Sequence, residues 1–189
     1  MNSTDIDTEA AWIRRSRSGE KEAFGLLVQR YMKRAYYSAL GFLGSHEDAL
    51  DASQEAFVRA FLSLDRFDDK RSFFTWYYQI LRNHCLNVLR HRGLRTPALS
   101  ELTSVTPDMA SDDPQPDEAL ERADLRSKVW EAIWLLDAED RELIVAKDIL
   151  DTPYTVLAEL IGCPAGTVMS RVFHARCRLR VRLQEISGL

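Results

Sequence analysis

The chain has 189 residues, enough for one medium-sized domain or two small ones, and its hydrophobic fraction of 46% is ordinary for a folded protein. No apolar run is long enough to span a bilayer, and the polar start of the chain is unlike a secretory signal. Three cysteines without a CxxC spacing argue against a disulfide framework or a zinc site, so we expect reduced thiols, a cytoplasmic protein, and neither a metal nor another cofactor.

The net charge of −4 conceals a strong segregation of charge along the chain. Residues 70–100 and 160–184 contain basic residues and no acidic one, whereas residues 101–124 contain eight acidic residues opposed only by Arg122. Two basic stretches separated by an acidic one are typical of a protein with two phosphate-attracting surfaces.

Apolar residues recur with helical spacing along most of the chain. The spacing predicts helices at about 8–17, 20–43, 46–64, 73–92, 117–136, 138–150, 154–161 and 165–186. Four prolines among serine, threonine and aspartate interrupt the pattern between Gly93 and Pro116, which is the composition of a linker. We therefore expect an all-α fold: two small helical domains, residues 10–92 and 119–189, joined by a flexible acidic linker at 93–118.

The predicted helix 46–64 has an apolar stripe and an acidic face. The predicted core stripe consists of Leu50, Phe57, Phe61 and Leu64. The residues expected on or beside the exposed face are Asp48, Asp51, Gln54 and Glu55. An acidic face either pairs with a basic partner and sets its orientation, or is simply solvated.

The predicted helix 73–92 exposes an unusual set of side chains. Its buried side is formed by Phe74, Tyr77, Tyr78, Leu81, Cys85, Val88 and Leu89. Its other side carries Trp76, Gln79, Asn83, Asn87 and Arg90. An aromatic face stacks on unpaired bases, at about 1–3 kcal/mol per base, while amides read base edges and arginine holds phosphate. This face is therefore a candidate surface for single-stranded nucleic acid.

Residues 154–186 have the pattern of a helix-turn-helix. Gly162 suits the left-handed conformation after a helix, and Pro164 suits the start of the next one. The second helix has an apolar stripe formed by Val168, Val172, Ala175, Leu179, Leu183 and Ile186. Its opposite side and flanks present Thr167, Ser170, Arg171, Phe173, His174, Arg176, Cys177, Arg178 and Arg180. Short polar side chains flanked by arginines are what reading of the major groove requires, although an ordinary amphipathic helix has a similar pattern.

Residues 24–31, 46–57 (HEDALDASQEAF) and 73–83 (FFTWYYQILRN) resemble the polymerase-binding and DNA-melting domain of bacterial sigma factors. Residues 166–176 (GTVMSRVFHAR) resemble the domain of the same factors that reads the upstream promoter element. With only a linker between the two, the chain resembles the extracytoplasmic-function (ECF) group. The resemblance implies an alternative sigma factor that is not an enzyme, binds core RNA polymerase and promoter DNA, takes no small-molecule substrate, is a monomer when free, and is controlled by an anti-sigma factor, often membrane-anchored.

The resemblance also implies a role for each candidate residue. Asp48, Asp51, Gln54 and Glu55 would contact core polymerase. The downstream (−10) element would be bound by Phe67, Lys70, Arg71, Trp76, Gln79, Asn83, Asn87 and Arg90. The upstream (−35) element would be bound by Thr167, Ser170, Arg171, Phe173, His174, Arg176 and Arg178. The chain departs from its relatives at Leu50, where an acidic residue is usual, and at Met169 and His174, where many have a basic one.

Two other functions have weaker support in the sequence. A self-sufficient helix-turn-helix repressor or activator would need a dimerisation or ligand domain, and it leaves the face with Trp76 and Asn83 unexplained. A small helical enzyme would need a nucleophile motif, a phosphate loop or a metal-spaced cluster, and the sequence contains none of these.

Overall fold

The computed structural model describes the backbone of residues 3–91 and 116–188 and, within these ranges, the side chains of residues 8–91 and 124–188. Over these residues the chain is helical and contains no strand, as predicted. Most of the predicted linker lies outside the described residues. Its last three positions, from Pro116, belong to a helix.

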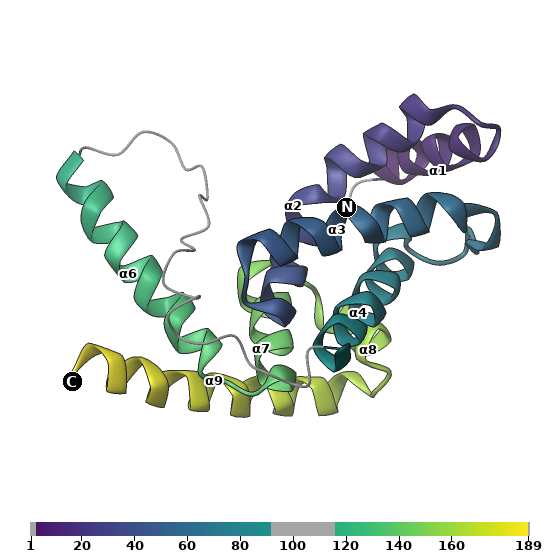
Figure 1. Ribbon diagram of the computed structural model, residues 1–189. Helices are drawn as coiled ribbons and strands as arrows, with labels where there is room; N and C mark the ends of the chain where they lie inside the picture. The colour runs from purple at the N-terminus through teal and green to yellow at the C-terminus, as the bar shows by residue number, and fades with distance from the viewer. Residues whose placement is uncertain (1–2, 92–115, 189) are drawn as a thin grey trace.

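The N-terminal domain is a bundle of four helices (Figure 1). They are α1 (Ser3–Arg17), α2 (Lys21–Leu43), α3 (His46–Leu62) and α4 (Phe73–His91), with a short 3-10 turn η1 (Leu64–Arg66) after α3. Helix α1 starts earlier than predicted and packs on α2, where its buried Ile13 joins the core.

The C-terminal domain contains the other helices that the structure describes. They are α6 (Pro116–Trp134), α7 (Ala138–Ile144), α8 (Tyr154–Ile161) and α9 (Ala165–Ser187), with a π-helical turn η2 (Val145–Ile149) after α7. The single helix predicted at 138–150 is therefore a short α-helix extended by a π turn. Among the described residues, no single helix has the length and apolar content to cross a membrane; α8 and α9 reach these only as a pair, which is bent by 97°.

Local side-chain chemistry fixes the helix boundaries. The Ser45 hydroxyl accepts a hydrogen bond from the backbone N–H of Asp48, and the Asp137 carboxylate accepts one from the N–H of Asp140, so each caps the helix that follows it. After α8, Gly162 has φ of 76° and donates its N–H to the carbonyl of Ala158. A left-handed residue at this position turns the chain into α9.

Helix α3 packs through small residues. Its buried face is formed by Ala49, Ala52, Ser53, Ala56, Phe57 and Ala60. Leu50, predicted in the core, is 38% exposed, so that prediction was wrong. Alanines let neighbouring helices approach closely, and this close packing turns Leu50 outward.

The two domains pack against each other. Helix α2 contacts α7 and η2, and α4 contacts α8. Figure 1 shows α7 and α8 beside the helices of the N-terminal domain, with α9 running past them and the end of α6 meeting α9. Buried apolar residues of both domains form a single hydrophobic cluster.

Candidate nucleic-acid interface

Helix α9 presents an exposed face on the side opposite its buried stripe. Val168, Val172 and Ala175 are fully buried against the domain. Thr167, Ser170, Phe173 and His174 are exposed, as the sequence predicts, and Met169 is exposed beside them. The Phe173 ring is 62% exposed and meets the His174 ring edge-on, with the ring centroids 5.5 Å apart. The face therefore offers hydroxyl, imidazole and aromatic groups to a partner.

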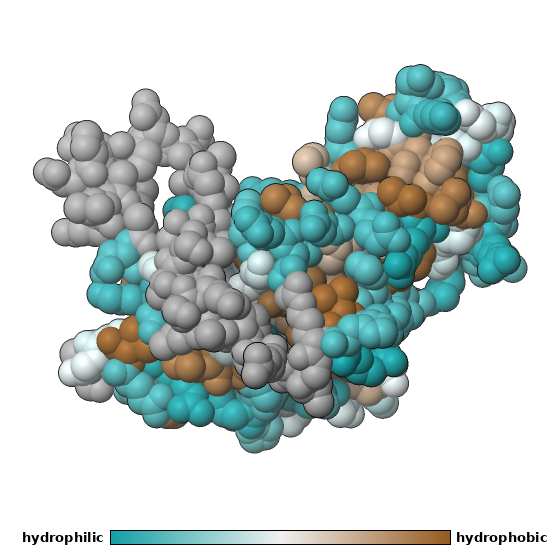
Figure 2. Space-filling view, in the orientation of Figure 1, coloured by the Kyte–Doolittle hydropathy of each residue, from teal (hydrophilic) through white to brown (hydrophobic). Residues whose placement is uncertain are grey.

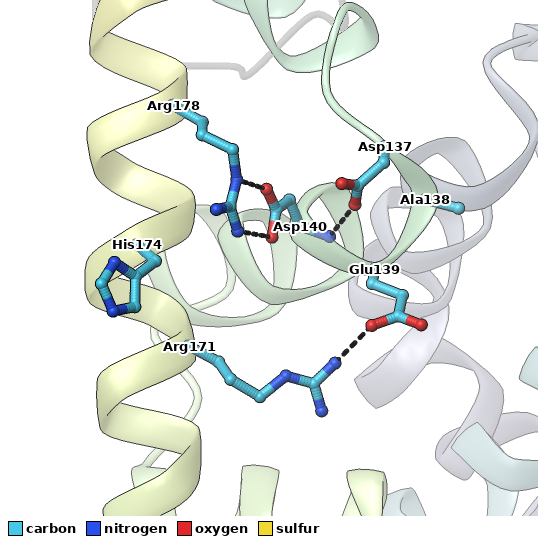
Figure 3. Close-up of a pocket in the computed structure, with 7 residues that line it drawn as sticks. All are labelled: Asp137, Ala138, Glu139, Asp140, Arg171, His174 and Arg178. Carbon is cyan, nitrogen blue, oxygen red and sulfur yellow. Dashed lines mark hydrogen bonds and ion pairs between the residues drawn. The ribbon is translucent and has the colours of Figure 1, made fainter.

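Three arginines beside this face form ion pairs within the protein, and Figure 3 shows two of them, Arg171 and Arg178. Arg171 donates to the Glu139 carboxylate at 2.7 Å. Arg178 forms a two-pronged pair with Asp140, whose second bond, from Nη2 to Oδ1, is 2.6 Å. Farther along, Arg176 binds Asp148 in the same way, with Nε 3.1 Å from Oδ2. These contacts attach α9 to α7 and η2.

Arg178 and Asp140 cross one end of a groove between α7 and α9. The groove has a volume of about 400 Å³ and is lined by Asp137, Ala138, Glu139, Asp140, Arg171, His174 and Arg178. Asp140 is buried, and the hydrogen bond to it is the main cause that raises the pKa of Arg178. Three carboxylates line the same groove, so its arginines have intramolecular competitors for any phosphate.

Helix α4 carries the second candidate surface. Asn83, Asn87 and Arg90 are exposed, whereas Gln79 and Trp76 are half-buried. The Trp76 ring lies 5.2 Å from the ring of Phe67 and 5.8 Å from that of Phe73, measured between centroids. Aromatic packing thus holds one face of the tryptophan against the domain.

Phe67 lies beneath this surface. It is only 5% exposed, and it packs against Phe73, with a ring centroid distance of 5.8 Å, and under the guanidinium of Arg17. The sequence analysis assigned Phe67 to binding of the −10 element, and in this structure the side chain offers almost no surface for such a contact. The side chain fills the junction of α1 and α4, where burial outweighs its position in a loop.

The loop before α4 exposes Lys70 and Arg71. Asp68 organises its turn by accepting the backbone N–H of Lys70 on its carboxylate at 3.0 Å and that of Arg71 on its carbonyl at 2.9 Å. Arg17 of α1 binds Asp69 at 2.9 Å and fastens the loop to the bundle. The two basic side chains therefore start from an ordered turn.

Helix α3 presents a mixed acidic and apolar face. Asp51 and Gln54 are exposed, while Asp48 and Glu55 are half-buried. The Glu55 carboxylate accepts a hydrogen bond from Arg59 at 2.7 Å. Three apolar side chains share the exposed side of the helix: Leu50, Val58 and Leu62. Figure 2 shows apolar surface on the part of the molecule where α2 and α3 lie.

A buried polar cluster joins the two domains, and the sequence analysis missed it. Glu142 of α7 is 8% exposed and accepts hydrogen bonds from the Tyr78 hydroxyl at 2.9 Å and from Arg82 at 2.8 and 3.3 Å. Burial, and then the neighbouring Glu142, raise the pKa of Tyr78 well above its usual value. Glu142 directly follows the charged residues 139–141, so the local sequence contained no signal that its carboxylate would be buried.

Among the described side chains, no group of three or more His, Cys, Asp or Glu residues could hold a metal ion.

Residues 27–95 match the family described as Sigma-70 region 2, and residues 126–179 match that described as Sigma-70, region 4. The RNA polymerase sigma-H factor of Pseudomonas aeruginosa is 31% identical over 180 residues, which cover 92% of this chain and 93% of that protein. The ECF RNA polymerase sigma factor SigW of Bacillus subtilis is 28% identical over 179 residues, covering 92% and 96%.

Two solved structures have a similar fold. One is CnrH in complex with the cytosolic domain of CnrY, with a TM-score of 0.68 and 25% identity over 94% of this chain and 98% of that one. The other is the sigma factor RpoE in complex with the anti-sigma factor NepR from Bartonella quintana, with a TM-score of 0.63 and 25% identity over 88% and 97%.

Proposed function

The chain belongs to the sigma-70 family of RNA polymerase factors, in its ECF group, and we propose that α3 binds core polymerase while α4 and α9 read separate promoter elements. As an alternative sigma factor it directs promoter-specific initiation of transcription. The observation that carries the assignment of surfaces is that one chain exposes two helix faces of different chemistry, Trp76 with amides on α4 and hydroxyl, aromatic and imidazole groups on α9.

The face of α3 fits a protein partner. Exposed apolar side chains such as Val58 and Leu62 supply buried area on binding, while Asp51 and Gln54 set orientation by charge and hydrogen bonds. Glu55 would contribute together with Arg59, because the two already form an ion pair. Asp48, at the start of the helix, would lie at the edge of the contact.

The face of α4 fits a separated strand. Trp76 is held in place by Phe67 and Phe73, so its free side would stack on an unpaired base without first losing conformational freedom. Gln79, Asn83 and Asn87 would contact base edges. The basic groups Lys70, Arg71 and Arg90 would hold phosphates. Extruding a base costs a few kcal/mol, and capture on this face would offset part of that cost.

The face of α9 fits duplex DNA. Thr167, Ser170, Phe173 and His174 would lie in the major groove, where hydroxyl and imidazole groups reach base edges and an aromatic edge meets a thymine methyl. Arg171 uses one N–H on Glu139 and keeps others for phosphate, whereas Arg176 and Arg178 each commit two. Arg176 and Arg178 would therefore act mainly by positioning the helix.

Polymerase would supply all catalysis, and the chain would work in the cytoplasm, as a monomer when free. Two similar structures are complexes with CnrY and with the anti-sigma factor NepR. By analogy, an anti-sigma protein, anchored in the membrane, would control this factor. Such a partner would act by covering the polymerase-binding or DNA-binding faces.

Run-off transcription with core polymerase on promoters randomised at −35 and −10 tests the assignment. Wild-type protein should select a defined pair of elements. Asp51→Arg combined with Gln54→Ala should abolish both transcription and co-purification with core polymerase while helicity is unchanged. Glu22→Arg, a charge reversal on exposed α2, is the matched control and should behave as wild type. Normal core binding by the double variant would refute the role of α3.

A further inference from the structure

Arg17, the last residue of α1, binds the segment between α3 and α4 at three points. Its Nε donates to the carbonyl of Leu64 at 3.2 Å, its Nη2 donates to the carbonyl of Phe67, and its Nη1 donates to the Asp69 carboxylate at 2.9 Å. A guanidinium has several N–H donors in one rigid plane, and here they reach two backbone groups and one side chain at once. One residue of α1 thus holds a loop that lies about fifty residues farther along the chain.

The same guanidinium supports the aromatic part of the α4 surface. It lies over the ring of Phe67, 5.8 Å from the centroid, and that ring is 5.2 Å from the ring of Trp76. The loop that Arg17 holds also carries the exposed side chains of Lys70 and Arg71. The tryptophan and the two basic groups of the proposed −10 surface are therefore connected to α1 through a single residue.

The two carbonyl contacts of Arg17 matter more than its ion pair. Leu64 and Phe67 are 3% and 5% exposed, so water has little access to replace a lost donor at their carbonyls. The Asp69 side chain is 63% exposed, and solvent screens an ion pair at such a position. The hydrogen bond within the turn, from the N–H of Phe67 to the carbonyl of Leu64 at 3.1 Å, is local and does not set the direction of the loop. Apart from the packing of Phe67, that direction depends on Arg17.

We propose that Arg17 is a positioning residue for recognition of the −10 element, so that α1 takes part in promoter choice without touching DNA. The inference rests on the proposed function, because it requires the α4 face to bind that element. Helix α1 precedes residues 27–95, which match Sigma-70 region 2, so the family match assigns it no role. A loop fixed before binding presents Lys70 and Arg71 in one place, and no ordering entropy is lost when DNA arrives. A loosened loop would find phosphates on any sequence, so the preferred base would lose its advantage over the others.

Transcription from promoters that differ at a single −10 position tests the proposal. With holoenzyme, the ratio of transcription from the preferred base to that from the other three bases should fall by a factor of about five or more for Arg17→Ala. Loss of folded protein would lower transcription from all promoters alike, so a purely structural role would leave this ratio unchanged. Core binding and the preference at −35 should be those of the wild type.

Two further variants separate the carbonyl contacts from the charge. Arg17→Lys keeps a positive charge near Asp69, but its single nitrogen cannot reach both carbonyls, so the ratio should fall about as far as for Arg17→Ala. Arg14→Ala removes the same charge from an exposed position on α1 and should keep the wild-type ratio. A wild-type ratio for either variant of Arg17, or an equal fall for Arg14→Ala, would overturn the inference. Absence of any −10 preference in the wild-type protein would instead count against the proposed function.

Hydrogen exchange in the free full-length protein gives a second test that needs no polymerase. In Arg17→Ala the amide hydrogens of residues 64–72 should exchange about tenfold faster or more, because the loop opens without its anchor. Those of residues 77–90 on α4 should exchange at the wild-type rate, and Arg14→Ala should change neither segment. Unchanged exchange in the loop, or an equal increase throughout the N-terminal domain, would overturn the positioning role.

Discussion

Cys85 lies on the buried side of α4, and its surroundings control its reactivity. Burial raises the pKa of the thiol to about 12, whereas Cys177 is exposed and Cys163 is half-buried. Only the thiolate is a good nucleophile, so we expect a disulfide reagent at pH 8 to modify two cysteines in the native protein and three after denaturation. Rapid modification of a third thiol without denaturation would contradict this.

The same shift predicts how Cys85 contributes to stability at high pH. The folded thiol keeps its proton over the range, from about pH 9 to about 12, in which the unfolded thiol loses it. Unfolding then releases a proton from Cys85. The contribution of this thiol to the free energy of unfolding is therefore constant below pH 9 and falls as the pH rises above it. Cys85→Ala should lessen the loss of stability between pH 9 and 11, as measured by denaturant titration.

A substitution at His174 tests which residues of α9 determine promoter preference. His174 is exposed on α9, where its ring meets that of Phe173 edge-on. His174→Ala should change the preferred base at one upstream position, at about 1–3 kcal/mol for the best site. Selection on a randomised −35 element with holoenzyme measures this.

Arg171→Ala is the matched variant for that experiment. Loss of a phosphate contact should weaken all sequences alike and reduce the slope of log affinity against log salt by about one. An unaltered preference profile for His174→Ala would mean that the reading face lies elsewhere on the helix.

The roles of single residues could be predicted from sequence only where the surroundings are local. The exposure of Ser170 and Phe173 follows from the periodicity of α9, because the opposite stripe must be buried. The burial of Phe67 depends on α1, and the ion pairs of Arg176 and Arg178 depend on α7 and η2. Helical angle shows the direction of a side chain but not which partner it meets.

At the scale of elements, α4 combines a packing face and a binding face, and two substitutions separate them. Trp76→Ala removes contacts with Phe67 and Phe73 and should lower the free energy of unfolding by about 1–3 kcal/mol, less than for a fully buried tryptophan. Asn83→Ala, at an exposed position, should leave stability unchanged. Both should slow formation of the open complex on duplex promoters.

A promoter opened in advance at the −10 element checks that the defect lies in melting. It should largely restore initiation by Asn83→Ala and, at a temperature where the variant is folded, by Trp76→Ala. Failure of this rescue with normal core binding would assign the face another role.

The attachment of α9 to α7 makes a further prediction. Arg178→Ala leaves buried Asp140 without its counter-ion, so the melting temperature of the protein should fall. Arg180 is an exposed neighbour on the same helix, and the control variant Arg180→Ala should melt at the wild-type temperature. The salt dependence of DNA binding should change less for Arg178→Ala than for Arg171→Ala. An unchanged melting temperature with a slope reduced by one would show that Arg178 contacts phosphate instead.

Helix boundaries depend on local caps and turns: Gly162 follows α8 in the left-handed conformation, as predicted, and the structure adds Ser45 and Asp137 as caps of the helices that follow them. The packing of α3 was not predicted correctly. Large apolar residues dominate a periodicity argument, so Leu50 was assigned to the core, whereas the real contact is made by alanines. The length of α7 was also misjudged, because the π turn at Val145–Ile149 preserves the helical pattern of hydrophobic residues.

For the whole molecule, the order of helices and the division into two helical regions follow from the sequence, since both depend on periodicity and on a proline-rich interruption. The docking of one region on the other does not. It rests on partners such as Gly41 with Val145 and Arg82 with Glu142, which are far apart in the chain and unremarkable alone. A glycine or a glutamate in a helix does not by itself indicate a contact between domains, because many helices contain such residues at exposed positions.

The shared core predicts how the molecule unfolds. Because buried residues of both domains form one cluster, the wild-type protein should unfold in a single calorimetric transition with equal calorimetric and van't Hoff enthalpies. Glu142→Ala leaves the buried Tyr78 hydroxyl without its acceptor and half-buried Arg82 without its counter-ion, which should cost about 1–3 kcal/mol. This loss of stability weakens the contact between the two domains, so each domain should unfold separately. The calorimetric enthalpy of the variant should then exceed its van't Hoff enthalpy. Glu159→Ala, on the exposed side of α8, removes the same charge outside the cluster and should retain the single transition. If Glu142→Ala also unfolds in one transition at the wild-type temperature, the carboxylate does not couple the domains.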